Sequence, residues 1–155
     1  MLKVGDVAPD FSIAATNGTK VSLNSLRGRP VVLYFFPKAF TMGCTIETRQ
    51  FRDNYEELSA LGVEVIGISV DRFDQQCRFA SDNKLPFPLV GDEDKKICDN
   101  YGVLWPLIKL PQRITFVIDE AGLIQAVFHH EVQISRHLDD VRKFLEQRRT
   151  ATTAP

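Results

Sequence analysis

VVLYFFPKAFTMGCTIE, residues 31–47, gives the clearest indication of the fold. Its first six residues, 31–36, are apolar or aromatic and are followed by Pro37, a pattern typical of a strand buried on both faces in a parallel sheet. Beyond a short loop, apolar residues recur at helical spacing as far as about Leu61, so we expect a helix there. Cys44 then lies in the first turn of this helix, at the carboxyl end of the strand.

The expected position of Cys44 favours a negative charge. Backbone N–H groups and the positive end of the helix dipole favour a thiolate over a thiol at a helix N-terminus. Ligand crevices of open α/β sheets also lie at the carboxyl ends of strands. The first hypothesis from the residues is therefore that Cys44 is a nucleophile.

The remaining elements follow from periodicity and turn residues. They are a hairpin over 11–13 and 20–22, a buried strand over 63–70, a helix with Phe73, Cys77 and Ala80 along it, an edge strand at 89–90, a short helix over 92–101, a hairpin over 114–119 and 123–129, and a helix from about Ser135. This order predicts an α/β protein with a thioredoxin-like fold, in which a mixed central sheet is flanked by helices and preceded by an N-terminal β-hairpin. We expect one domain over residues 1–149 and a disordered tail over 150–155.

Composition narrows the class of partner. The 155 residues are 44% hydrophobic and 25% charged, with a formal net charge of −1, and the charges are interspersed. No basic stripe for nucleic acid, no polybasic membrane patch and no span of about 20 apolar residues is present. The N-terminal residues also lack the pattern of a signal peptide. We therefore expect a cytoplasmic protein that binds neither nucleic acid nor membrane.

The cysteines and histidines do not follow a metal-binding pattern. The three cysteines form no Cys-x-x-Cys motif, and no acidic or cysteine ligand keeps regular spacing with His129, His130 and His137. We expect no metal, and we interpret these histidines as surface or sheet-end residues. Trp105, in a Pro-interrupted loop, is interpreted as a packing residue.

Five segments carry a resemblance to a known family. They are the motif Pro37-x-x-x-Thr41-x-x-Cys44, VGDVAPDF at 4–11, LRGRPVVL at 26–33, LPFPL at 85–89 and RITFVID at 113–119. With these segments, in this order over nearly the whole chain, the sequence resembles the peroxiredoxins, and within them the bacterioferritin-comigratory-protein or Q-type subfamily.

The resemblance implies a thiol-dependent peroxidase that needs no cofactor. Hydrogen peroxide or a small organic hydroperoxide would oxidise Cys44 to a sulfenic acid, and a thioredoxin- or glutaredoxin-type reductant would restore the thiol. The protein would be a monomer or a weak homodimer. The implied site residues are Cys44 as nucleophile, Arg113 beside it, Thr41 as a hydrogen-bonding hydroxyl, Pro37 as a shield of the thiolate, and Glu47 as the partner of Arg113.

The sequence departs from the subfamily at two positions. Many members carry a resolving cysteine five residues after the nucleophile, where this chain has Arg49, and proline is commoner at the position of Met42. Other members carry the resolving cysteine near the position of Ala80, one turn after Cys77. Three routes of resolution stay open: a disulfide with Cys77, which we rank first, a disulfide with Cys98, or attack by an external thiol.

Two other functions fit the same residues. In a thioredoxin-fold redox sensor or interaction protein, Cys44 would be oxidised stoichiometrically without turnover. In a Cys-His hydrolase, one of the histidines would activate the thiol, and Arg113 would be dispensable.

Overall fold

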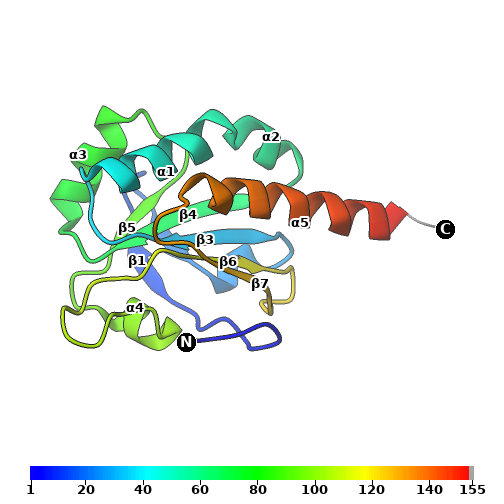
Figure 1. The fold of residues 1–155 in the computed structure, drawn as a ribbon, viewed down its shortest axis with the longest axis horizontal. Helices are drawn as coiled ribbons and strands as arrows, with labels where there is room; N and C mark the ends of the chain where they lie inside the picture. Colours follow the sequence, from blue (N-terminus) through cyan, green and yellow to red (C-terminus); the bar gives the residue numbers. More distant parts are fainter. Residues whose placement is uncertain (154–155) are drawn as a thin grey trace.

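A five-stranded mixed sheet forms the centre of the protein (Figure 1). The computed structural model describes the backbone of residues 1–153 and the side chains of residues 1–148. The strands of the sheet are β3 (Val31–Phe35), β4 (Glu64–Ser69), β5 (Leu89–Gly91), β6 (Ile114–Ile118) and β7 (Ile124–His129). Their order is β5-β4-β3-β6-β7.

The central strand is the one expected from the apolar run. Every residue of β3 is buried, and β3 pairs in parallel with β4 and antiparallel with β6. β5 extends the parallel part at one edge, and β6 and β7 form the expected antiparallel hairpin. The predictions of a mixed sheet, of a short edge strand and of the C-terminal hairpin are confirmed.

The helices cover the sheet unequally, as Figure 1 shows. They are α1 (Met42–Asp53), α2 (Tyr55–Ala60), α3 (Phe73–Asp82), α4 (Lys96–Tyr101) and α5 (Ser135–Thr153). Helices α1, α2, α3 and α5 lie on one face of the sheet, whereas α4 and the N-terminal segment lie on the other.

Two helices differ from their predicted extent. The single helix expected up to Leu61 is broken at Asn54, which has φ −112° and ψ 8° and whose side chain donates to the carbonyl of Gln50. Helix α4 begins at Lys96 rather than Asp92, because Lys95 adopts a left-handed conformation (φ 63°). Asp92 instead accepts hydrogen bonds from the first turn of α4.

The two ends of the chain also refine the predictions. The N-terminal hairpin is confirmed as β1 (Ser12–Ala14) paired antiparallel with β2 (Lys20–Ser22). At the other end, the backbone of α5 continues through Thr153, into the segment expected to be a disordered tail. The rest of that predicted tail, 154–155, lies outside the described residues.

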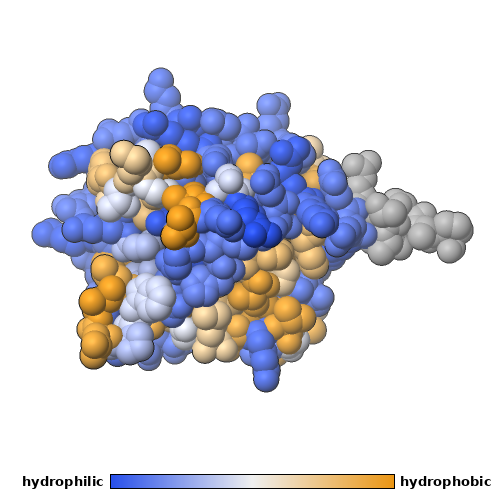
Figure 2. Space-filling model, viewed as in Figure 1, coloured by the Kyte–Doolittle hydropathy of each residue, from blue (hydrophilic) through white to orange (hydrophobic). Residues whose placement is uncertain are grey.

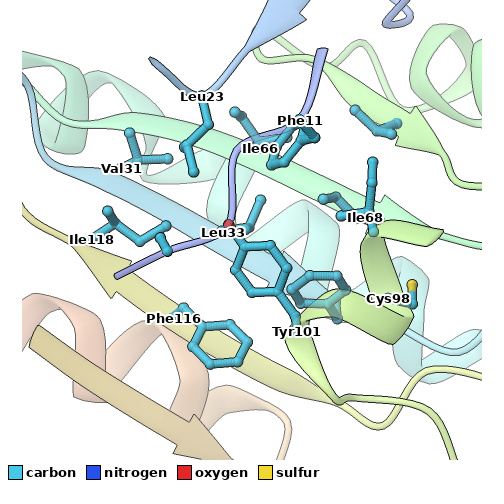
Figure 3. Close-up of a cluster of buried hydrophobic side chains, with 14 of the residues drawn as sticks. Phe11, Leu23, Val31, Leu33, Ile66, Ile68, Cys98, Tyr101, Phe116 and Ile118 are labelled. Atoms are coloured by element: carbon cyan, nitrogen blue, oxygen red, sulfur yellow. The ribbon is translucent and has the colours of Figure 1, made fainter. Parts of the chain in front are cut away.

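Two separate hydrophobic cores lie on the two faces of the sheet. Alternate residues of β3 belong to different cores: Val31, Leu33 and Phe35 to one, Val32 and Tyr34 to the other. This alternation is the period-two geometry of a strand buried on both faces. The first core contains Cys98, Tyr101 and residues of the N-terminal segment (Figure 3). The second contains Cys44.

The surface has no large apolar area on the face that Figure 2 shows. Hydrophobic residues form several small groups on a mostly hydrophilic face. Trp105 is 36% exposed and lies beside the ring of His129, so it packs at the surface of the protein. Within the described part of the chain, no helix has both the length and the apolar character needed to cross a bilayer.

Candidate active site

Cys44 lies where the central strand leads into the first long helix. It is the third residue of α1, and Thr41 precedes the helix in an extended conformation (φ −79°, ψ 153°). The Cys44 side chain is fully buried. The predicted position of Cys44 in the first turn of a helix is confirmed. The N–H groups of such a turn have no intrahelical partners.

Arg113 brings a cation to this sulfur. It directly precedes β6, whose first residue pairs with Phe35 at the carboxyl end of β3. Its Nη1 lies 3.4 Å from Cys44 Sγ and 3.0 Å from Glu47 Oε1. Burial opposes the guanidinium charge, but Cys44 and Glu47 outweigh that effect and raise the pKa of Arg113.

Glu47 is the second acid of the site. It lies one turn after Cys44 on α1 and is completely buried. Burial raises the pKa of Glu47 from 4.5 to about 8, although Arg113 acts in the opposite direction. Its Oε2 has no hydrogen-bond partner among the described residues.

Thr41 and Pro37 frame the loop between β3 and α1. Pro37 is half-buried, and the exposed Thr41 donates its hydroxyl hydrogen to the carbonyl of Lys38 at 2.7 Å. The Thr41 oxygen therefore keeps its capacity to accept. The loop is fixed at Ala39, whose N–H donates to Asp71 Oδ2 at 2.7 Å.

Asp71 is a residue of the site that the sequence interpretation missed. It follows β4, is buried, and also accepts a 2.5 Å hydrogen bond from Ser69 Oγ. A polar pair at the carboxyl end of a buried strand, next to the strand that leads to Cys44, was the signal in the sequence.

His137 corrects the interpretation of the histidines as surface or sheet-end residues. His129 does end β7, but His137 on α5 is fully buried. Its Nε2 lies 2.8 Å from the carbonyl oxygen of His130 and 3.7 Å from Glu47 Oε2, and its Nδ1 lies 2.8 Å from Thr115 Oγ1. Helical spacing could have found this, because His137 lies four residues before the buried Val141.

Gly43 was missed as well. A Cβ atom at this position would lie 2.9 Å from Ile134 Cδ1 and 3.1 Å from Arg113 Nη2. The absence of a side chain at Gly43 therefore makes room for the guanidinium to approach the helix. A glycine inside a helical first turn was the available signal.

The other two cysteines have different surroundings. Cys98 is buried in the core on the opposite face of the sheet, where burial raises its pKa. Cys77 on α3 is partly exposed and lines a surface hollow of about 260 Å³ together with Thr16 and Lys84. All three cysteines are free thiols.

Helix α3 does not use the face that the predicted spacing suggested. Its buried residues are Gln76 and Phe79, and Phe73 is 40% exposed. Arg49 replaces the cysteine expected from the subfamily and donates to Asn83 Oδ1 at 2.8 Å, while Arg52 donates to the Asn83 carbonyl at 2.9 Å. The end of α3 is thus tied to α1.

Comparison with known proteins decides the family. The model of the AhpC/TSA family matches residues 4–127. The chain belongs to this family. Its curated relatives include peroxiredoxin Bcp of Escherichia coli K12, 40% identical over 152 residues with 94% of this chain and 97% of the relative covered. Chloroplastic peroxiredoxin Q of Sedum lineare is 40% identical over 143 residues, covering 92% and 77%.

Solved structures agree with this assignment. The crystal structure of peroxidoxin BcpB from Mycobacterium tuberculosis superposes with a TM-score of 0.88 at 33% identity, covering 95% of this chain and 98% of that one. The predictions of a thioredoxin-like fold and of a peroxiredoxin of the Q or Bcp type are confirmed. In the described part of this peroxiredoxin, no group of three His, Cys, Asp or Glu residues is arranged to hold a metal ion.

Proposed function

We propose that this peroxiredoxin is a thiol-dependent peroxidase whose nucleophile is Cys44, activated by Arg113. Membership in the family supports the peroxidase activity and a thioredoxin-type reductant. The observation that carries the assignment of residues is the 3.4 Å approach of Arg113 Nη1 to a buried sulfur in a helix first turn.

The chemistry follows from this arrangement. The Cys44 thiolate attacks one peroxide oxygen, the O–O bond breaks, and the other oxygen leaves as hydroxide or alkoxide and takes up a proton. Arg113 Nε is buried without a partner among the described residues, so a donor remains for a peroxide oxygen. Preorganised donors of this kind stabilise the charge that moves across the breaking bond.

Thr41 and Pro37 have supporting roles in this proposal. The Thr41 oxygen accepts a hydrogen bond from the incoming peroxide while its hydrogen remains on the Lys38 carbonyl. Pro37 removes a backbone donor and limits water access beside the thiolate. Glu47 holds Arg113 through a charge-assisted pair at 3.0 Å.

A stopped-flow experiment tests the nucleophile. Wild type, Cys44→Ser and the control Cys98→Ala are mixed with hydrogen peroxide, first alone and then with a thioredoxin and NADPH recycling system. We expect turnover in wild type and in Cys98→Ala and none in Cys44→Ser. Turnover by Cys44→Ser would overturn the assignment. One oxidation per chain without recycling would identify a redox sensor instead.

A Cys-His hydrolase is disfavoured by the same geometry. Among the described residues, Cys44 hydrogen-bonds with Arg113 and with no histidine. His137, the buried histidine of the site, uses both ring nitrogens elsewhere. Loss of activity in a histidine variant together with an indifferent Arg113→Ala variant would favour the hydrolase.

We also propose that the sulfenic acid is resolved by Cys77 rather than Cys98. Cys98 lies on the other side of the sheet from Cys44, whereas Cys77 is on a helix that contacts the Cys44 side. A disulfide requires Cα atoms about 4.4–6.8 Å apart. Because Cys44 is fully buried in the first turn of α1, we expect α1 and α3 to open locally before the two sulfurs meet. A glutaredoxin-type thiol would attack Cys44 directly if Cys77 does not.

Mass spectrometry under non-reducing conditions distinguishes the routes. After one equivalent of peroxide, we expect a Cys44–Cys77 peptide pair in wild type and none in Cys77→Ser. Full thioredoxin-driven turnover by Cys77→Ser, with Cys44 recovered only as sulfenic acid or a mixed disulfide, would reject Cys77.

We propose in addition that the working unit is a single domain acting as a monomer or weak homodimer in the cytoplasm. The small size of the hydrophobic groups on the face in Figure 2 supports this oligomeric state. Light scattering across a concentration series checks it, and a stable larger assembly would contradict it.

A further inference from the structure

Two buried acids share one cation in this site. Nη1 of Arg113 contacts both Cys44 Sγ, at 3.4 Å, and Glu47 Oε1, at 3.0 Å. Cys44 and Glu47 are both completely buried. Two negative charges on a single guanidinium, sealed from water, would leave one of them uncompensated, which is costly in an apolar interior.

His137 does not supply a second cation. Its Nε2 faces the carbonyl oxygen of His130, which only accepts, so Nε2 carries the ring hydrogen. Its Nδ1 then accepts from the hydroxyl of Thr115. Burial lowers the pKa of His137 to about 4, so the ring next to Glu47 is neutral at neutral pH.

The other groups around Glu47 add no positive charge either. Burial raises the pKa of Tyr34 on β3 well above its usual value, so its phenol is uncharged. Glu131, before α5, accepts from the Arg113 backbone N–H and is an additional acid that raises the pKa of Glu47. Among the described residues, Arg113 and His137 thus lie closest to the Glu47 carboxyl, while Tyr34 and Glu131 influence it electrostatically and Cys44 shares Arg113 with it.

The hydrogen bonds of the Glu47 carboxyl also indicate too few positive or donating groups for a second negative charge. Oε1 is paired with Arg113, but Oε2 is buried without a hydrogen-bond partner among the described residues. A buried carboxylate needs hydrogen-bond donors at both oxygens, whereas a protonated carboxyl carries less charge on the unpaired one. This is the arrangement expected of a carboxyl group that is neutral while a neighbouring acid is charged.

We infer that Glu47 carries a proton while Cys44 is a thiolate and gives up this proton when Cys44 is oxidised. This inference rests on the proposed peroxidase function. In the oxidation step, Cys44–S⁻, HO–OR and Glu47–COOH become Cys44–SOH, HOR and Glu47–COO⁻. The S–O bond forms and the O–O bond breaks, sulfur is oxidised and peroxide is reduced, and the leaving oxygen gains the proton that Glu47 loses.

The charge of the site is the same before and after this step. Once Cys44 is a neutral sulfenic acid, Glu47 is the remaining anion for Arg113 and takes over the full ion pair. Glu47 acts through Arg113 and does not touch the sulfur, so it is a positioning residue that also stores a proton. Reduction of Cys44 to the thiolate returns the proton to Glu47.

Infrared difference spectroscopy at pH 7 tests whether Glu47 loses a proton when Cys44 is oxidised. The spectrum of protein after one equivalent of hydrogen peroxide minus that of the reduced protein should lose one protonated carboxyl band per oxidised Cys44 and gain a carboxylate band. Labelling with carboxyl-¹³C glutamate should shift the lost band in wild type, which assigns it to glutamate without any substitution. The band should be absent in Glu47→Gln and present in Glu93→Gln, a control at an exposed position.

Proton counting gives a second readout. With a pH indicator in weak buffer, wild type should take up no net proton when Cys44 is oxidised, and Glu47→Gln should take up one. Oxidation of Cys44 without loss of a glutamate carboxyl band, or proton uptake by wild type equal to that of Glu47→Gln, would overturn the inference. Failure of peroxide to oxidise Cys44 at all would instead refute the proposed function.

Discussion

Arg113 performs two tasks with one nitrogen, since Nη1 contacts both the Cys44 sulfur and the Glu47 carboxyl. The residue is held at two points: Glu47 on α1 pairs with the guanidinium, and Glu131 accepts from the Arg113 backbone N–H. A cation fixed in this way needs no reorganisation when charge moves during the reaction.

Removal of this cation should slow the reaction with peroxide. For Arg113→Ala we expect a rate lower by on the order of a hundredfold, the effect of losing one preorganised donor. Stopped-flow kinetics measure this rate. Arg136→Ala, at an exposed position on α5, is the control. Wild-type rates in Arg113→Ala would place this residue outside the site.

Substitution of Gly43 should lower the rate of reaction with peroxide more than it lowers the stability of the fold. Alanine favours a helix over glycine, but its Cβ would lie only 3.1 Å from Arg113 Nη2 and would displace the guanidinium. For Gly43→Ala we expect a rate with peroxide roughly ten- to a hundredfold lower, because small displacements of a reacting group are costly.

The control for Gly43→Ala is Met42→Ala, in the same helical turn, whose side chain is 81% exposed. Urea unfolding should show a change of less than about 1 kcal/mol in both variants. Equal peroxide rates in Gly43→Ala and Met42→Ala would show that Arg113 does not depend on the missing side chain.

Among the elements, hydrogen bonds join α1 and the end of α3, the two helices that the proposed Cys44–Cys77 disulfide would require to separate. Asn83, at the end of α3, accepts from Arg49 and Arg52 of α1 and donates from its own amide to the carbonyl of Phe79. Phe40, in the loop before α1, packs against Phe79. Local opening therefore breaks a partly buried polar cluster as well as an aromatic contact.

Weakening this junction should accelerate disulfide formation. Asn83→Ala removes two side-chain hydrogen bonds, which should lower the free energy of unfolding by roughly 1–3 kcal/mol. Arg49→Ala removes one of them. We expect the rate of Cys44–Cys77 formation after peroxide, followed by quenched mass spectrometry, to rise in the order wild type, Arg49→Ala, Asn83→Ala. The same rate in all three proteins would mean that opening of α1 and α3 does not limit resolution.

Elements with strong local signals could be predicted from the sequence. The apolar run that forms β3 and the position of Cys44 at the start of α1 needed only periodicity and the end of a strand. The buried face of α3 was not predictable in this way, because Gln76 is buried through a hydrogen bond to the Val90 carbonyl. Local apolar spacing carries no information about such a partner.

The residues of the site also differ in how far the sequence could predict them. Arg113 came from resemblance, because nothing in its local sequence shows that β6 pairs with β3 and brings it to Cys44. Asp71 and His137 were missed because their roles arise from contacts between distant segments, to Ala39 in one case and to Thr115 in the other. Polar residues in buried positions are recognisable only when their partners are known.

At the scale of the whole molecule, the buried acid and the buried histidine give the stability opposite dependences on pH. The folded protein holds a proton on Glu47 up to about pH 8, above its ordinary pKa of 4.5, so stability falls as pH rises between these values. The pKa of His137 is lowered from 6.5 to about 4, so its contribution is lost as pH falls through that window.

Between pH 6.5 and 8 the effect of Glu47 is therefore unopposed by His137. We expect the free energy of unfolding of reduced wild type to fall over this range, by at most about 2 kcal/mol more than that of Glu47→Gln. Urea titrations at several pH values measure the difference. Parallel pH profiles for the two proteins would contradict a raised pKa of Glu47.

The sheet that separates the two cores also separates two kinds of thiol chemistry. Cys44 belongs to the core of the proposed peroxide site, while Cys98 lies in the other core, fully buried and protonated. An alkylating reagent applied to the native protein should therefore leave Cys98 unmodified, and unfolding should reveal this thiol, still reduced. Cys98 can thus serve as an internal reference when oxidised thiols are counted, because the five-stranded sheet separates it from the core that contains Cys44.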